Sequence, residues 1–182
     1  RGHETVHEKW DINTDILYAN LVDKFKWGNM DKEGVYLDET TLRQTRNFRN
    51  LFYRLAMKLV AEGDNARAIK ALDRCVEVMP NKTVAYDIFI IRLSEAYFAA
   101  GAPEKANALI NTMVDLAIEK YQYYSTFKGS KAKGVASELE ENANVLMYAQ
   151  QVAQFNKQDE LFKSIQAKAQ KTLGAQMAPP MQ

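Results

Sequence analysis

The chain has 182 residues, of which 47% are hydrophobic and 26% are charged, the composition of an ordinary globular domain. Its 24 basic and 23 acidic side chains leave a net charge of +1, so the charge balance gives no reason to expect a nucleic acid as partner. No apolar run approaches the roughly 18 residues that indicate a membrane-spanning helix. The single cysteine, Cys75, excludes an internal disulfide and lies where a small core residue is expected.

The N-terminal part is predicted to hold one helix followed by a loop. The first residues have neither an initiator methionine nor the apolar region of a signal peptide, so we expect a fragment of a longer or processed chain. Apolar residues recur at helical spacing over residues 14–26, and Asn13 or Thr14 can cap this helix. Glycines then interrupt the spacing, so the chain up to residue 38 is expected to form a loop.

Two pairs of amphipathic helices are predicted over residues 39–121. The expected helices cover about 39–62, 65–79, 83–100 and 103–121. Asp38 is the expected N-cap of the first helix. Gly63 and Gly101 separate the helices within each pair, as glycine commonly does at a helix end.

The last third of the chain is predicted to hold a loop, a third helix pair and a tail. Residues 122–134 contain glycines and lysines and are expected to form a mobile, basic loop. Residues 135–173 are expected to form a divergent pair, with helices over about 136–155 and 158–173 and with Asn156 in place of the glycine. Residues 174–182 lack an apolar stripe and are expected to be disordered.

Two stretches share one pattern of small and apolar residues. The matching residues are Leu55, Ala56, Leu59, Gly63, Ala68, Leu72 and Cys75 in the first stretch and Leu93, Ser94, Tyr97, Gly101, Ala106, Ile110 and Met113 in the second. This pattern resembles the tetratricopeptide (TPR) repeat, whose stacked helix pairs form binding and scaffolding surfaces. The expected fold is therefore all-α, with about seven helices in one domain over residues 1–173. The antiparallel TPR-like pairs would form a superhelix or a compact bundle.

The resemblance to TPR repeats implies an inner groove that contacts a protein or peptide partner. Carried over position by position, its lining residues are Asn50, Tyr53, Met57, Ile91, Arg92, Glu95 and Phe98. Because several of these side chains are apolar, either an apolar partner fills the groove or the chain's own helix over residues 14–26 does. We favour the second interpretation, since a monomer rarely leaves a large apolar patch exposed.

One short motif matches a metal-dependent enzyme. His3, Glu4 and His7 fit the H-E-x-x-H pattern, in which two imidazoles bind Zn²⁺ and the glutamate acts as base. The motif lies close to the start of the chain, where no cleft or third ligand can be assigned. We therefore expect no catalytic residue, no metal site and no cofactor.

Two further motifs have an ordinary structural interpretation that we favour. Asn81-Lys82-Thr83 fits an N-glycosylation acceptor, but it also suits a turn that caps a helix. The other motif is the set Arg43, Arg46, Arg49 and Arg54. These arginines can hold a carboxylate or a sugar phosphate, but they also suit the solvated face of an amphipathic helix.

Four strings in the first two-thirds of the chain carry a second resemblance. They are residues 24–28 (KFKWG), 35–39 (VYLDE), 46–50 (RNFRN) and 75–82 (CVEVMPNK). They resemble the C-terminal region of large multi-pass bacterial membrane proteins of unassigned function. The N-terminal part of those proteins looks like a lipid-linked-sugar glycosyltransferase of the protein mannosyltransferase type. The resemblance implies a soluble domain on the extracytoplasmic, periplasmic side, without the catalytic residues of its parent.

Three hypotheses of function follow. The first is a non-catalytic interaction or scaffolding domain of a membrane-bound, glycosyltransferase-like protein, with a protein, a peptide or the parent's own membrane part as partner. The second is an independent TPR module that binds peptides. The third is a zinc hydrolase that uses His3, Glu4 and His7.

Overall fold

The computed structural model describes residues 12–32 and 34–174, and these residues form eight α-helices, one π-helical segment and no strand. The all-α class is confirmed, with one α-helix more than the seven expected. The chain divides into two compact units. The first unit holds the described residues up to 89 together with 99–102, and the second holds 90–98 and 103–174. The single domain and the TPR-like arrangement stay predictions.

The first unit begins with two short helical segments instead of one helix. Helix α1 (Thr14–Tyr18) has the expected cap, because the Asn13 side chain accepts the N–H of Ile16 at 2.9 Å. The π-helical segment η2 (Ala19–Lys24) follows directly, and it closes with a wide turn in which the N–H of Phe25 donates to the carbonyl of Asn20 at 2.8 Å. The helix predicted over residues 14–26 is therefore confirmed in its approximate position. After Tyr18 its winding changes from α-helical to π-helical.

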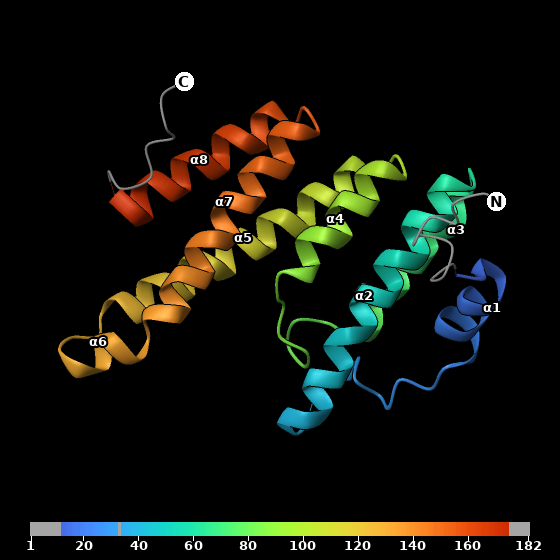
Figure 1. Ribbon diagram of the computed structural model, residues 1–182, viewed down its shortest axis with the longest axis horizontal. Helices are drawn as coiled ribbons and strands as arrows, with labels where there is room; N and C mark the ends of the chain where they lie inside the picture. Colours follow the sequence, from blue (N-terminus) through green and yellow to red (C-terminus); the bar gives the residue numbers. More distant parts are fainter. Residues whose placement is uncertain (1–11, 33, 175–182) are drawn as a thin grey trace, which may run out of the picture. The chain divides into compact units, whose positions relative to one another are not determined.

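Helices α2 (Glu39–Ala61) and α3 (Asn65–Val78) form the helix pair of the first unit, as predicted (Figure 1). Asp38 caps α2 by accepting the N–H of Thr41 at 2.9 Å. The helices pack through side chains with no exposed surface, which are Phe52, Leu55, Leu59, Ala68, Ala71 and Leu72. Cys75 is buried with them, as expected.

The turn between α2 and α3 has the hydrogen bonds of a Schellman motif. The N–H of Asp64 donates to the carbonyl of Leu59 at 2.8 Å, and the N–H of Gly63 donates to that of Val60 at 3.0 Å. Gly63 has φ of 82°, a conformation that glycine adopts without strain. The prediction that Gly63 ends the helix is therefore confirmed.

Helix α4 (Phe89–Ala99) begins six residues later than predicted, because a buried arginine holds the preceding segment in a loop. The guanidinium of Arg49 donates to the carbonyls of Met79, Val84 and Ala85 at 3.2, 2.6 and 2.9 Å. The three carbonyls converge on one guanidinium, whereas the carbonyls of a helix point in parallel along its axis, so this segment is not helical. The expected helix over residues 83–100 is therefore wrong in its first turns.

The second unit contains three long helices that pack against one another, α5 (Pro103–Ser125), α7 (Ala136–Phe155) and α8 (Asp159–Leu173) (Figure 1). Their core includes Ile110, Val114, Leu146, Ala149, Ala153 and Ile165, which have at most 1% exposed surface. The predicted loop over 122–134 is wrong in part. Helix α5 continues to Ser125, and the short helix α6 (Ser130–Gly134) fills much of the remainder.

The turn between α7 and α8 repeats the Schellman hydrogen bonds without a glycine. The N–H of Gln158 donates to the carbonyl of Ala153 at 2.8 Å, and the N–H of Lys157 donates to that of Gln154 at 3.0 Å. Lys157 has φ of 55°, whereas Asn156 has φ of −88°. The expectation that Asn156 takes the place of the glycine is therefore wrong, because Lys157 does. The tail expected over 174–182 lies outside the described residues except for Gly174.

Candidate functional site

The residues of the predicted TPR groove divide between the two units. In the first unit, α2 carries Asn50, Tyr53 and Met57, which are all half-buried. In the second, α4 carries the buried Ile91, the exposed Arg92 and the half-buried Glu95 and Phe98. Each set shares one helix, and the two sets belong to different units. The groove therefore stays a prediction.

The N-terminal segment lies on the face of α2 that is turned away from the predicted groove residues. The rings of Phe25 and Phe48 meet edge to face with centroids 6.2 Å apart, and the Thr14 hydroxyl donates to Glu62 at 2.9 Å. With 3.6 residues per turn, Phe48 and Glu62 lie roughly across the helix from Tyr53 and Met57. These contacts place the N-terminal segment against another face of α2, and the interpretation that residues 14–26 fill the groove stays a prediction.

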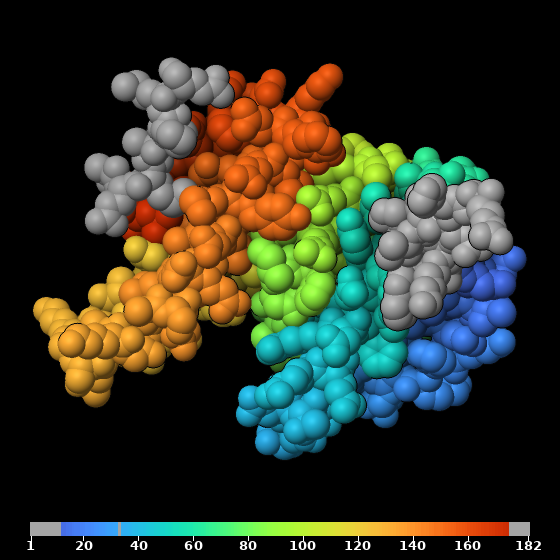
Figure 2. Space-filling model, viewed as in Figure 1, coloured from blue at the N-terminus to red at the C-terminus, as the bar shows by residue number. Residues whose placement is uncertain are grey.

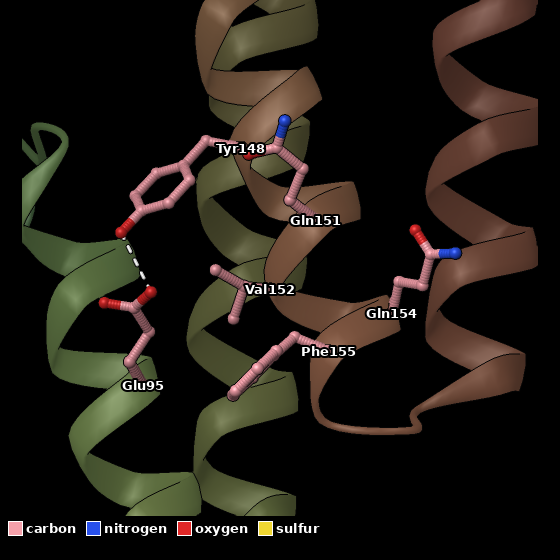
Figure 3. Close-up of a pocket in the computed structure, with 6 residues that line it drawn as sticks. All are labelled: Glu95, Tyr148, Gln151, Val152, Gln154 and Phe155. Atoms are coloured by element: carbon pink, nitrogen blue, oxygen red, sulfur yellow. Dashed lines mark hydrogen bonds between the residues drawn. The ribbon is translucent and has the colours of Figure 1, made fainter. Parts of the chain in front are cut away.

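A pocket of about 520 Å³ lies in the second unit between α4 and α7 (Figure 3). It is lined by Glu95, Tyr148, Gln151, Val152, Gln154 and Phe155. Its volume is within the range of pockets that hold a small ligand or one large side chain. The pocket contains one of the predicted residues, Glu95, and brings it together with residues of α7.

The polar anchor of this pocket is a hydrogen bond between its two walls. The phenol of Tyr148 points at Glu95 and donates to its Oε1 at 2.9 Å (Figure 3). This bond fixes one oxygen of a carboxylate that is half-buried, and Glu95 is the one charged side chain among the described residues of the lining. A carboxylate held in this way presents a negative charge in a fixed position.

The apolar part of the pocket combines a buried wall with an exposed ring. Val152 is 3% exposed, whereas Phe155 at the end of α7 is 87% exposed. The amides of Gln151 and Gln154 are exposed beside it. A phenylalanine that is exposed to this extent buries little apolar surface when the chain folds. It buries much more when a partner covers it, and that burial favours binding.

The residues from α7 were missed by sequence analysis. Tyr148, Gln151, Val152 and Phe155 are spaced i, i+3, i+4 and i+7, which places them on one face of the helix. The sequence contains that spacing. The neighbouring apolar stripe of α7 is the one that enters the core, and only that stripe was assigned from the sequence. The pairing of Tyr148 with Glu95, 53 residues away, required the structure.

A second hollow of about 340 Å³ lies in the first unit near η2. Its lining includes both acidic and basic side chains, among them Asp23, Lys26, Asp31 and Arg74. Because charges of both signs meet there, the lining favours no particular class of ligand. We therefore take the pocket between α4 and α7 as the candidate site.

The other motifs have structural roles or lie outside the described residues. The Asn81 side chain accepts the N–H of Tyr86 at 2.8 Å, and the Thr83 hydroxyl donates to the carbonyls of Met30 and Pro80, which agrees with a structural turn. His3, Glu4 and His7 lie outside the described residues. Within the described ranges, no group of three or more His, Cys, Asp or Glu side chains is placed to hold a metal ion.

The arginine cluster does not form one surface. Arg43 is exposed and pairs with Glu39 at 3.5 Å, whereas Arg49 has no exposed surface and holds Asp87 at 3.1 Å in addition to its three carbonyls. The favoured interpretation of a solvated face is therefore wrong for Arg49. Its guanidinium also lies 5.3 Å from the centre of the Tyr86 ring, a cation–π distance.

No family model, no curated protein and no solved structure matches this chain. Among the helices of residues 12–32 and 34–174, none is long and apolar enough to cross a membrane.

Proposed function

We propose that this chain is a non-catalytic interaction domain, and that the pocket between α4 and α7 binds a basic side chain of a polypeptide partner. The observation that carries this proposal is the combination of a fixed carboxylate, Glu95, with an exposed aromatic ring, Phe155, in one pocket. A lysine or arginine has an apolar stem and a cationic end, so it can contact both features.

The charge of the lining decides between possible ligand classes. With Glu95 as its charged group, the pocket repels a carboxylate or a phosphate and attracts a cation. The ring of Phe155 adds a face over which a cation is also favoured. The exposed amides of Gln151 and Gln154 supply donors and acceptors for the backbone of a bound segment.

The side chains in the pocket suit binding better than catalysis. The described lining offers one carboxylate and one phenol, and these two groups are already hydrogen-bonded to each other. It contains no serine, cysteine, histidine or lysine that would act as a nucleophile or as a base near neutral pH. The glycosyltransferase-like parent and its periplasmic location stay predictions from the short strings, and the pocket is independent of them.

The test uses capped tripeptides, Leu-Lys-Leu and Leu-Gln-Leu, titrated into the protein and followed by amide NMR. We expect shifts around Glu95, Tyr148 and Phe155 with the lysine peptide and much weaker shifts with the glutamine peptide. The variants Glu95→Gln and Phe155→Ala should each weaken binding of the lysine peptide about tenfold, which corresponds to about 1.4 kcal/mol.

Two control variants separate the pocket from the general surface of α7. Glu140→Gln removes an exposed carboxylate from the same helix, and Met147→Ala removes an apolar side chain that is 43% exposed. Both should leave binding unchanged. Equal binding of the two peptides, or equal losses in the control and pocket variants, would contradict the proposal.

A further inference from the structure

The end of helix α5 carries a cluster of three aromatic rings. Tyr123, Tyr124 and Phe127 meet edge to face, with centroids 5.2 to 6.3 Å apart. Tyr123 is 60% exposed even though it belongs to this cluster. An apolar cluster at a helix end, outside the packed core of α5, α7 and α8, calls for an explanation other than core packing.

Lysines flank this aromatic cluster in the sequence. From Lys120 to Ser137 the chain carries Lys120, Lys128, Lys131 and Lys133 and no aspartate or glutamate. All four lysines are exposed, and in the described part of the chain no salt bridge involves any of them. By contrast, Lys168 on α8 pairs with Asp115 at 2.6 Å.

The cluster and the lysines share one end of the second unit. Helix α6, which carries Lys131 and Lys133, connects the end of α5 to the start of α7 (Figure 1). In the space-filling view this connection forms a narrow projection of the unit (Figure 2). We call residues 120–137 the aromatic–lysine tip. Carboxylates resume at Glu119 and Glu138, on the helices that lead away from it.

We propose that the aromatic–lysine tip docks onto the surface of an anionic lipid bilayer. Tyrosine suits the boundary between headgroups and acyl chains, because its ring is apolar and its hydroxyl is polar. Lysines beside it gain from the negative potential of the surface and keep their ammonium groups in water. The tip offers both features in one place, and it does so independently of the pocket between α4 and α7.

The same features fit a single-stranded nucleic acid less well. Bases stack on free ring faces, whereas the three rings here lie at 60° to 70° to one another and use their edges and faces within the cluster. The tip also lacks arginine, whose planar fork binds phosphate in two places. An anionic bilayer is therefore the partner that the tip favours.

Co-sedimentation of the full chain with vesicles tests this proposal. The vesicles consist of phosphatidylcholine alone or with roughly one-third phosphatidylserine, an anionic lipid. We expect binding to the mixed vesicles only, and release at high salt because the attraction is screened. The combined variant Lys128→Gln, Lys131→Gln and Lys133→Gln should weaken binding on the order of a hundredfold, at roughly fivefold for each lysine.

Two further variants make the result specific to the tip. Lys70→Gln, Lys82→Gln and Lys163→Gln together remove the same charge from exposed positions elsewhere and should leave vesicle binding unchanged. Tyr123→Trp should add fluorescence to that of Trp10 and Trp27, and brominated lipids should quench this variant more than the unsubstituted protein, because the added ring enters the headgroup region. The proposal is overturned by absent binding to anionic vesicles, by equal losses in both lysine variants, or by binding to single-stranded DNA in place of vesicles.

Discussion

Replacing Arg49 should cost more stability than replacing any other arginine of the predicted cluster. Its guanidinium is fully buried and donates to three carbonyls and to Asp87. The variant Arg49→Met keeps a long apolar side chain, so it leaves little empty space, but it removes every donor. The buried carbonyls of Met79 and Val84 then lose this donor, whereas Asp87 keeps the N–H of Phe89.

The size of the effect follows from which acceptors water can reach. Met79 and Val84 have no exposed surface, so their carbonyls stay dry and should cost about 2–4 kcal/mol together. Asp87 is 18% exposed and keeps the N–H of Phe89, so the loss of Arg49 there should add only about 1 kcal/mol. We expect Arg49→Met to lower the free energy of unfolding by about 3–5 kcal/mol, a large part of the total for a small domain.

Urea unfolding followed by far-UV circular dichroism measures this loss, with Arg43→Met as the control. Arg43 is mostly exposed and pairs with an exposed glutamate, so its replacement should change stability by less than about 0.5 kcal/mol. Hydrogen exchange over residues 79–89 should also accelerate in Arg49→Met. A loss below about 1 kcal/mol, or equal losses in both variants, would refute the reasoning that these carbonyls depend on Arg49.

Three further predictions concern single residues. Lys157→Gly should raise stability by about 1 kcal/mol in thermal unfolding, because it relieves a positive φ, whereas Lys157→Ala keeps the strain and should not. The Cys75 thiol should resist alkylation until the protein unfolds, because it is 1% exposed and burial raises its pKa; rapid labelling of the folded protein would contradict this. Hydrogen bonds from the backbone and side chain of Arg67 hold the pKa of Asp64 below its usual value of 3.8. The Asp64 carboxylate should therefore stabilise the fold fully above pH 3.8, and this stabilisation should be lost as the pH falls through the lowered pKa. A carboxyl titration by NMR that gives an ordinary pKa for Asp64 would disprove the last prediction.

The positions of most helices could be predicted because local chemistry sets them. Asp38 and Gly63 act at helix ends through bonds to residues within five positions, and such signals can be read from a sequence. The start of α4 was missed for the opposite reason. It depends on Arg49, 40 residues before Phe89, and the pattern of α2 placed that arginine among solvated neighbours.

The candidate site shows the same division between local and distant information. Glu95 was named as a groove residue from the resemblance to TPR repeats, but the pocket that contains it depends on Tyr148 and Phe155, which α7 supplies. A helix carries several faces, and sequence periodicity identifies the apolar one that enters the core. It does not identify which of the remaining faces meets another helix, so the wall of a pocket between helices is found only when the helices are placed.

The two Schellman turns show that such a turn can form without a glycine. A Cβ added to Gly63 would meet nothing within 4 Å, so its backbone φ of 82°, and not a lack of space, is what favours glycine there. At Lys157 the same pair of hydrogen bonds forms with a side chain present, at a cost of roughly 1–2 kcal/mol. The packing of α7 against α8 far exceeds that cost, since Leu161, Ile165 and Ala169 are all buried. A search for glycines therefore finds the Schellman turns in which glycine avoids the backbone strain of a positive φ. It misses the turns in which another residue adopts a positive φ and the packing of the helices outweighs that strain.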